Sequence, residues 1–249
     1  MTDSANGTVS LDGVAVVTGG SQGIGLATVV ALASAGMTVV PLARDRARLD
    51  AMTAGLETEL RDRVVGIAAD VTDERSVVAA LAEVRDRFGG FDVVVNSAGV
   101  SMTAKRRLVD TSFDEWARLV DTNLTGTYLM CRHALPTLEE RGGYIVNVLS
   151  TAAHRATAGV SLYAASKYGA RALTEALIEE YRGSSVRISS ISPGPVDTTI
   201  WEHKVEPPSA PERARMMRPS DLAEVIAWML ARPPTLHVGD ITVTPWVSA

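Results

Sequence analysis

Two side chains four residues apart could together transfer a proton. Tyr163 and Lys167 stand in the segment Tyr-Ala-Ala-Ser-Lys, and residues at i and i+4 of a helix share one face. A phenol with an ordinary pKa of about 10 is a poor acid or base at neutral pH, but a neighbouring ammonium favours the phenolate and lowers that pKa. The pair predicts a tunable proton donor or acceptor, although this spacing alone also occurs by chance on amphipathic helices.

Other polar residues stand where buried strands would end. Ser150 comes directly after one short apolar run, Asn96 ends another, and Pro193-Gly194 ends a third, while Asn123 lies in a long helical pattern. Open α/β sheets bind ligands at the carboxyl ends of their strands. We therefore expect these residues to meet the tyrosine–lysine pair at one edge of a sheet.

The elements that must position these residues follow from the apolar pattern. Short, β-branched runs predict strands buried on both faces of a parallel sheet, over 14–18, 38–42, 64–69, 92–95, 144–149, 186–191 and 241–244. Helical patterns separate them over 25–35, 74–88, 113–135, 163–181 and 220–230. The alternation predicts right-handed βαβ units, an α/β doubly wound fold and one domain over 1–249.

One segment breaks the alternation. Residues 199–218 contain three prolines and predict a loop or a short irregular helix pair, placed as a lid on the substrate side. Trp201, Met216 and Met217 lie in this segment. They could cover a substrate or simply pack a short helix, since both kinds of segment share this composition.

A glycine-rich turn follows the first expected strand and opens a helix. It runs Thr18-Gly-Gly-Ser-Gln-Gly-Ile-Gly25, with Gly19, Gly23 and Gly25 at the spacing G-x-x-x-G-x-G. Glycines permit a tight turn and a close approach of backbone to a pyrophosphate, and the helix N-terminus offers free N–H groups. The context predicts a dinucleotide site, although a plain strand-to-helix turn can have the same composition.

The end of the second strand bears on the choice of dinucleotide. Ala43 stands where an acidic residue would accept the ribose hydroxyls of NAD, and Arg44 follows, whose guanidinium can pair with a 2′-phosphate. NADP(H) is therefore favoured, and NAD(H) stays possible, because Asp45 could turn inward and oppose the phosphate. Alternatively, Arg44 is a solvated arginine in a stretch that also contains Arg46 and Arg48.

Composition narrows the functional classes. The 249 residues carry a net charge of −5, which gives no electrostatic grip on nucleic acid or an anionic membrane. Without a signal-peptide pattern or a long apolar stretch, a cytoplasmic protein is expected. Cys131 is the single cysteine and is expected to be buried and inert. No metal site is expected, because the four histidines share no ligand spacing; His154 lies near the expected substrate side.

Taken in order, these motifs resemble the short-chain dehydrogenase/reductase family in its classical form. The resemblance runs from about Leu11 to Thr244 and rests on the glycine-rich turn, Asp70, Asn96-Ser-Ala-Gly99, Asn123, Ser150, Tyr163-x-x-x-Lys167 and Pro193-Gly194. It implies a Rossmann-like domain with a seven-stranded parallel sheet flanked by helices. Ser97 and Leu149 depart from the family's usual asparagine and serine, and the chain ends without the common Asp-Gly-Gly tail.

The resemblance implies a catalytic role for four residues. Tyr163 would be the general acid/base, and Lys167 would lower its pKa and hold the nicotinamide ribose. Ser150 would hydrogen-bond the substrate oxygen, and Asn123 would anchor a water in a proton relay. The implied reaction is hydride transfer between NADP(H) and a carbonyl or secondary alcohol, as in a ketone or 3-oxoacyl reductase.

The resemblance also implies a cofactor site and an assembly. The cofactor-binding residues would be Gly19, Ser21, Gln22, Gly23, Ile24, Gly25, Arg44, Asp70, Val71, Asn96, Ala98, Gly99, Tyr163, Lys167, Pro193, Gly194, Val196 and Thr198. The expected partners are a small carbonyl or alcohol substrate and further copies of the chain, in a homodimer or homotetramer paired through the helices over 113–135 and 163–181. The alternative is a regulator or sensor that binds NADP(H) with little turnover.

Overall fold

The computed structural model describes residues 11–246, and the domain expected over 1–249 extends beyond them at both ends. All strands in the central sheet are parallel. They are β1 (Val14–Thr18), β2 (Thr38–Ala43), β3 (Ile67–Ala68), β4 (Val93–Asn96), β5 (Gly143–Val148), β6 (Val186–Pro193) and β7 (Asp240–Val243). The order β3-β2-β1-β4-β5-β6-β7 reverses direction between β1 and β4, and such a switch point is where open α/β sheets bind ligands.

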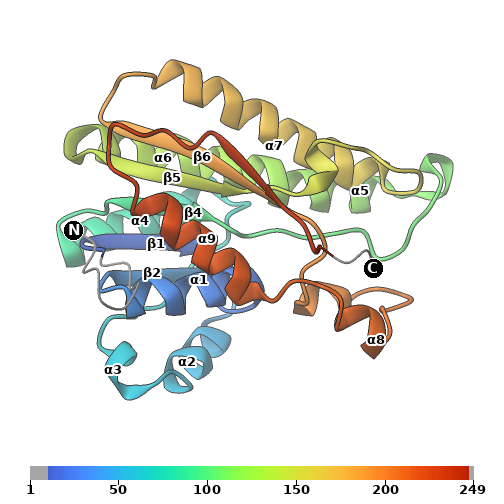
Figure 1. The fold of residues 1–249 in the computed structure, drawn as a ribbon, viewed down its shortest axis with the longest axis horizontal. Coiled ribbons are helices and arrows are strands. Elements are labelled where there is room, and N and C mark those ends of the chain that lie inside the picture. Colours follow the sequence, from blue (N-terminus) through green and yellow to red (C-terminus); the bar gives the residue numbers. More distant parts are fainter. Residues whose placement is uncertain (1–10, 247–249) are drawn as a thin grey trace.

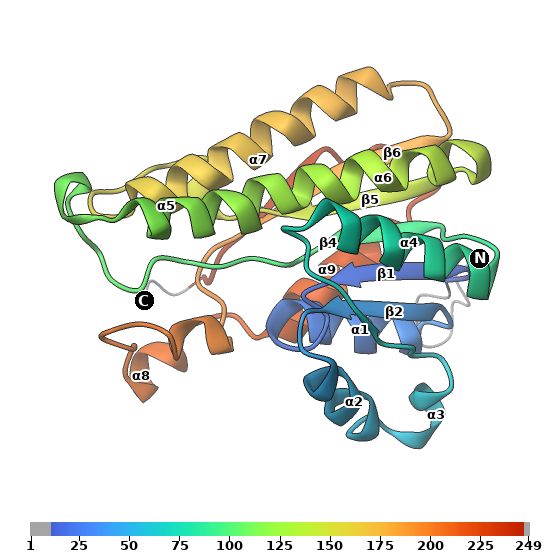
Figure 2. The same cartoon turned by 180° about the vertical axis from the view of Figure 1, so that it is seen from behind.

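Helices cover both faces of the sheet (Figures 1 and 2). Helices α1 and α9 cover one face, and α4, α6 and α7 cover the other, while α2 and α3 lie beside the β3 edge. The helices are α1 (Gly23–Ser34), α2 (Arg46–Ala54), α3 (Thr58–Arg61), α4 (Glu74–Phe88), α5 (Phe113–Val120), α6 (Gly126–Arg141), α7 (Ser161–Glu180), α8 (Ala210–Arg213) and α9 (Pro219–Leu230). Shorter turns are η1 (Leu108–Asp110), η2 (Asp121–Thr125, a π-helical turn), η3 (Thr151–Ala153) and η4 (Thr199–Trp201).

The two faces of each strand enter two separate cores. In β1, Val17 packs with Leu32 of α1 and with α9, whereas its neighbour Val16 packs with Leu81 of α4 and Leu138 of α6. Side chains alternate between faces along a strand, so a strand covered on both sides must be apolar throughout. This explains the uninterrupted apolar runs and confirms the predicted α/β fold with a seven-stranded parallel sheet.

Several predicted elements differ from the observed ones. The single helix expected over 113–135 is α5, the π-helical turn η2 and α6, which continues to Arg141. The strand expected over 64–69 shortens to Ile67–Ala68, with one further bridge between Val39 and Val64. Helices α2 and α3 were not expected, because α2 buries only Leu49 and α3 buries nothing, so neither shows a clear apolar face. No helix within residues 11–246 is long and apolar enough to cross a membrane.

The segment 199–218 is irregular, as predicted, and its large side chains are anchored to the fold. Met217 is buried in the α1–α9 core and forms a bridge with Val196. The Trp201 indole donates a hydrogen bond to the Val196 carbonyl at 2.7 Å. For these two side chains, the structure therefore favours packing over a free lid.

Candidate active site

Three of the expected catalytic residues meet at the end of β5. Ser150 lies two residues beyond β5 and begins η3, while Tyr163 and Lys167 lie on the first two turns of α7. The Lys167 ammonium donates a hydrogen bond to the Val148 carbonyl at 3.0 Å. This bond fixes α7 against the end of β5 and brings the three residues together.

The Ser150 hydroxyl is oriented as a donor. Its Oγ accepts a hydrogen bond from the Ala152 N–H at 3.1 Å, so its own proton is free to be donated. Beside it, burial raises the pKa of the Tyr163 phenol, and the Ser150 side chain opposes that rise. The pKa lowering expected from Lys167 is not the direction found here, because desolvation dominates. The phenol is therefore protonated at neutral pH, as a proton donor must be.

Lys167 is a buried cation. Its side chain lies among buried groups, with only 5% of the residue exposed, and burial lowers its pKa to about 8. A charged group that leaves water loses solvation, which favours its neutral form. Gly99, expected at the cofactor cleft, lies next to this ammonium: a Cβ on Gly99 would be 3.6 Å from Nζ. The loop after β4 thus joins the site.

Asn123 ties that loop to α7. Its Oδ1 accepts from the Val100 N–H, and its Nδ2 donates to the Val100 carbonyl, both at 2.9 Å. The same Nδ2 donates to Ser166 Oγ at 3.0 Å, and Ser166 Oγ donates to the Tyr163 carbonyl at 2.8 Å. The side-chain amide is therefore engaged on both sides, so Asn123 positions the tyrosine helix. Its π-helical turn is of a kind frequent at functional sites.

The glycine-rich turn forms a cradle of bare backbone. Gly19 and Gly23 have φ of +65° and +55°, which L side chains rarely adopt. A Cβ on Gly19 would lie 2.9 Å from the Ala98 Cα, and one on Gly25 would lie 2.3 Å from the Gly19 carbonyl oxygen. Thr18 Oγ1 adds a hydrogen bond from the Ala98 N–H at 3.0 Å. Backbone so close, opening a helix, fits the phosphates of a dinucleotide.

The loop after β6 reaches the same cradle. A Cβ on Gly23 would lie 3.3 Å from Thr198 Cγ2. Thr198 precedes η4, and Val196 is buried under it. Gly194 donates its N–H to the Val243 carbonyl at 2.8 Å, so this glycine belongs to the pairing with β7. Thr198 is thus brought to the glycine-rich turn, whereas Val196 is buried and forms a bridge with Met217.

Two other expected residues, Asp70 and Val71, follow β3. Asp70 Oδ1 accepts from the N–H and the hydroxyl of Thr72, at 2.9 and 2.8 Å. Val71 is buried against Gly126, where a Cβ would lie 2.9 Å from Val71 Cγ2. This contact fixes the end of β3 to the start of α6, which borders the cleft at the switch point of the sheet.

The Asn96 side chain lies in the core and does not face the cradle. It donates to Asn147 Oδ1 at 2.8 Å, and Asn147 donates to Thr174 of α7 at 2.9 Å. Its own Oδ1 is buried without a hydrogen-bond partner in the described part of the chain. Cys131 packs beside this pair, and burial raises the pKa of its thiol to about 12. The thiol is buried, as predicted, and burial disfavours the reactive thiolate.

The region after β2 contains a contact that the sequence pattern does not reveal. Asp45 caps α2 and accepts from the Arg48 N–H at 3.0 Å, so its carboxylate is engaged. The Arg48 guanidinium donates to Gln22 Oε1, inside the glycine-rich turn, at 2.6 Å. Arg44 is exposed beside them. No sequence pattern singles out Arg48, because its contact with Gln22 joins residues 26 positions apart and depends on where α2 begins.

His154 makes a second unexpected connection. Its Nε2 lies 2.8 Å from Ser192 Oγ of β6 and 3.4 Å from Asp240 Oδ2 of β7. Because His154 ends the η3 turn that begins at Ser150, these contacts fix the loop of the expected catalytic serine to the neighbouring strands.

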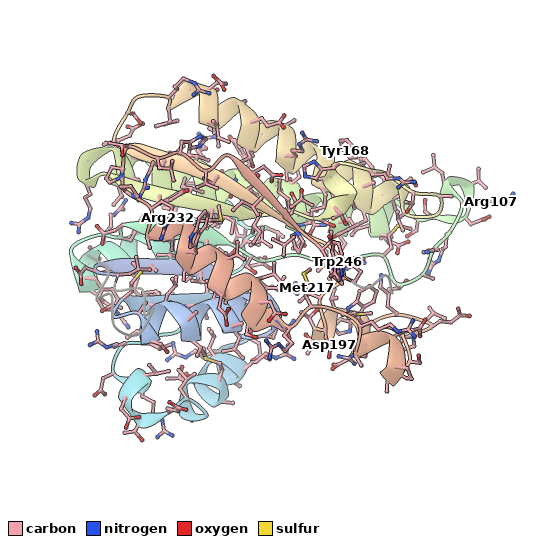
Figure 3. All side chains as sticks on the ribbon, in the orientation of Figure 1. Arg107, Tyr168, Asp197, Met217, Arg232 and Trp246 are labelled. Carbon is pink, nitrogen blue, oxygen red and sulfur yellow. The ribbon has the colours of Figure 1, made fainter. Side chains whose placement is uncertain are left out.

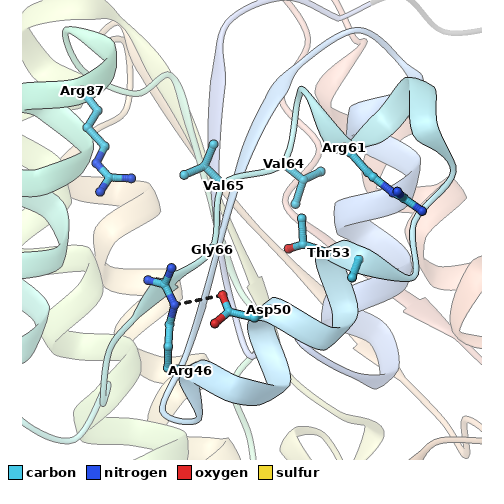
Figure 4. Close-up of a pocket in the computed structure, with 9 residues that line it drawn as sticks. Arg46, Asp50, Thr53, Arg61, Val64, Val65, Gly66 and Arg87 are labelled. Atoms are coloured by element: carbon cyan, nitrogen blue, oxygen red, sulfur yellow. Dashed lines mark hydrogen bonds and ion pairs between the residues drawn. The ribbon is translucent and has the colours of Figure 1, made fainter.

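A separate hollow of about 390 Å³ lies at the β3 edge of the sheet. Figure 4 shows that Arg46 pairs with Asp50 of α2 on one side of the hollow, while Arg61 and Arg87 lie farther apart; Thr53, Ala54, Val64, Val65 and Gly66 complete the lining. None of the expected catalytic residues lines it. The hollow therefore plays no part in the site at the end of β5.

Comparisons with known proteins identify the class. The chain matches the family model for short chain dehydrogenases over residues 13–208. An uncharacterised oxidoreductase of Staphylococcus aureus (strain USA300) is 34% identical over 239 residues, which cover 96% of this chain and 99% of that protein. The chain belongs to the short chain dehydrogenase family and is an oxidoreductase. The resemblance seen in the motifs is confirmed.

Solved structures agree. An alcohol dehydrogenase from the archaeon Thermococcus sibiricus, complexed with 5-hydroxy-NADP, superposes with a TM-score of 0.85 at 28% identity, covering 96% of this chain and 99% of that chain. A 3-ketoacyl-(acyl-carrier-protein) reductase from Brucella melitensis, complexed with NADH, has a TM-score of 0.83 at 27% identity, covering 92% and 96%. One of these similar structures thus holds a derivative of NADP, and the other holds NADH.

The buried ammonium predicts a distinct pH dependence of stability. The pKa of Lys167 falls from 10.5 to about 8 on folding, so the unfolded chain binds more protons between these pH values. Relative to a Lys167→Met variant, the wild type should gain stability as the pH rises through this window, by up to about 3 kcal/mol. Urea unfolding of both cofactor-free proteins at about pH 7, 9 and 10.5 measures the difference.

Two features make this measurement specific. Burial raises the pKa of the Tyr163 phenol above its usual value of about 10, so the phenol stays protonated at pH 7 and 9 in both proteins. The matched control is Lys105→Met, which removes an exposed lysine and should run parallel to the wild type. Parallel curves for Lys167→Met would show that the ammonium is not desolvated.

Proposed function

We propose that this protein interconverts a carbonyl and an alcohol using NADP(H). The observation that carries the proposal is the meeting of the Ser150 hydroxyl and the Tyr163 phenol at the end of β5, with the Lys167 ammonium behind them. Two hydrogen-bond donors side by side, one with a proton to give, suit a carbonyl oxygen that gains negative charge as it is reduced.

The side chains divide the work on that oxygen. In reduction, Ser150 donates a hydrogen bond to the carbonyl oxygen and Tyr163 transfers its proton to it, so the product is an alcohol and the phenolate remains. Lys167 stabilises this phenolate by its charge, and in oxidation the proton returns to it. A bound nicotinamide cofactor supplies or accepts the hydride. Asn123 contributes through the Val100 and Ser166 contacts that hold the loop and helix in place.

The cofactor would lie along the cradle and the neighbouring loops. Its phosphates would meet the backbone of Gly19, Gly23 and Gly25, and Thr198 would close over them from the loop after β6. Gly99 and Lys167 would border the nicotinamide ribose. The residues after β3 would border the adenine. These assignments rest on the bare backbone of the turn and on the family resemblance.

Removing the phenol hydroxyl tests the mechanism directly. Tyr163→Phe keeps the ring but removes the proton donor, so NADPH-dependent reduction of ketones should fall by about two to four decades, with NADPH affinity largely kept. Tyr168→Phe is the matched control, since Tyr168 lies on the same helix but is 40% exposed. Near-normal turnover in Tyr163→Phe would exclude this mechanism. Tight NADPH binding by a wild type that reduces no carbonyl would instead favour the binding-only alternative.

The preference for NADP(H) rests on the charges after β2. Arg44 is exposed beside the cradle, Arg48 reaches Gln22 within it, and the Asp45 carboxylate is engaged as the cap of α2. Two guanidinium groups, with the Asp45 carboxylate held at the N-terminus of α2, would favour a 2′-phosphate over a ribose hydroxyl.

This preference is measurable by titration. NADPH should bind about one to two decades more tightly than NADH, since each charge-assisted hydrogen bond contributes about 1.5–3 kcal/mol. Arg44→Ala should remove most of the difference and leave NADH affinity nearly unchanged. Arg46→Ala is the control, because Arg46 pairs with Asp50 at 2.9 Å. Equal affinities in the wild type, followed by fluorescence, would show that the arginines do not bind the phosphate.

The proposed assembly is a homodimer or homotetramer paired through α5, α6 and α7. Apolar side chains are exposed on this side, with Phe113 78% and Trp116 39% accessible on α5. Apolar surface of this kind suits the centre of a two-fold interface. Light scattering at micromolar concentration should give at least twice the chain mass, and Phe113→Glu should shift the protein toward the monomer. A strictly monomeric wild type would refute the assembly.

A further inference from the structure

A strap of chain crosses the candidate active site. The strap, residues 199–206, follows β6, and the Val205 N–H donates to the Thr103 carbonyl, in the loop after β4, at 2.9 Å. The Lys204 ammonium donates to Ser101 Oγ at 3.0 Å and also to the Met102 carbonyl. Since β4 and β6 flank β5 in the sheet, a link between the loops that follow them spans the end of β5, where the expected catalytic serine lies.

Lys204 also contacts the apolar wall against which the expected proton donor packs. Met102, whose carbonyl it contacts, is almost fully buried in an apolar cluster with Leu162 and Tyr163. The Lys204 ammonium therefore lies at the edge of the apolar cluster against which Tyr163 packs. A small molecule bound against this wall would have Tyr163 on one side and Lys204 at the other.

Among residues 11–246, the Lys204 ammonium has no counter-ion. Its contacts are the two neutral oxygens and the Trp201 ring, whose centroid is 5.6 Å away. Burial lowers the pKa of Lys204, and the nearby Arg118 and Lys105 lower it further. Within residues 11–246 no carboxylate pairs with Lys204.

The carboxylate whose charge does act on Lys204 is already hydrogen-bonded to other groups. Glu115 favours the charged lysine, but its Oε2 pairs with Arg106 at 3.4 Å and its Oε1 accepts from the Thr103 N–H at the same distance. Glu202 and Glu206, on the strap itself, are exposed to solvent. A half-buried cation among other cations, with one of its three N–H groups still available, is a site for an anion.

We propose that Lys204, together with Ser101, binds a carboxylate of the substrate, so that the protein acts on oxo acids and hydroxy acids in preference to neutral ketones and alcohols. This inference rests on the proposed function, since it assigns the substrate class of the same site. The carbonyl of such an acid would lie at Ser150 and Tyr163, and its carboxylate would complete the charge that the strap leaves unbalanced.

The test compares acids with their neutral isosteres. Reduction of short 3-oxo and 4-oxo acids by NADPH is measured beside that of the corresponding primary amides, which have the same shape without the charge. The wild type should show kcat/KM for at least one acid about tenfold to a hundredfold above that of its amide. Lys204→Gln should remove most of this ratio by raising KM for the acid far more than KM for the amide, and Lys204→Arg should keep the ratio.

A purely structural role of Lys204 would give a different result. If Lys204 only holds the strap in place, Lys204→Gln lowers activity toward acid and amide equally, and the inference fails. Arg107→Gln is the matched control for loss of charge, because Arg107 is 79% exposed and pairs with Asp110 at 3.0 Å. Figure 3 shows Arg107 at the outer tip of its loop, away from Asp197, which lies just before the strap.

The remaining outcomes separate this inference from the proposed function. If the wild type reduces the oxo amides or other neutral ketones as well as the oxo acids, or better, the proposed substrate class is wrong and the proposed function still stands. Loss of turnover in Tyr163→Phe on those neutral ketones confirms that the function stands. A wild type that reduces no carbonyl compound overturns both. The inference also requires a second result. Butyrate should inhibit the reduction of a ketone that the enzyme accepts, and butyramide should not.

Discussion

Parallel pairing of β4, β5 and β6 is the constraint on which the site depends. The register places Asn96 beside Asn147 and Val148 beside Ile191, so the three strands end at one edge. Every loop that follows them leaves from that edge. For this reason three segments are neighbours: the loop that binds Asn123, the turn that carries Ser150 and the strap that crosses them. They are neighbours although the chain between them includes three helices longer than two turns.

The candidate active site buries a charged group, the Lys167 ammonium, although this burial opposes folding. Lys167 is buried, and within the described residues its ammonium donates one hydrogen bond, to the Val148 carbonyl at 3.0 Å. Burying a charge opposes folding unless it is paired, so the surrounding fold must offset this cost. Close backbone contacts at the glycine-rich turn and the Asn96–Asn147–Thr174 hydrogen bonds supply rigid support on either side. The protein thus holds a cation beside the phenol at some cost in folding stability.

Local patterns predicted the strands and the cluster of motifs, because apolar periodicity and short glycine or tyrosine–lysine spacings are properties of adjacent residues. What they did not predict depends on tertiary packing. Arg48 meets Gln22 across 26 positions, and Lys204 meets Ser101 across 103. The pKa of Tyr163 shifts in the opposite direction from that expected, since desolvation exists only in the packed state. Helix α2 escaped prediction because it buries a single leucine.

The single thiol of the chain has a practical consequence. Cys131 lies between α6 and the strands β4 and β5, beside Asn96 and Asn147. A thiol that is sealed from water and held protonated cannot react with alkylating reagents until the surrounding helix separates from the sheet. Labelling of Cys131 by iodoacetamide therefore reports on opening of this one interface, without any engineered probe, and its protection by bound ligands would measure how strongly they hold the core closed.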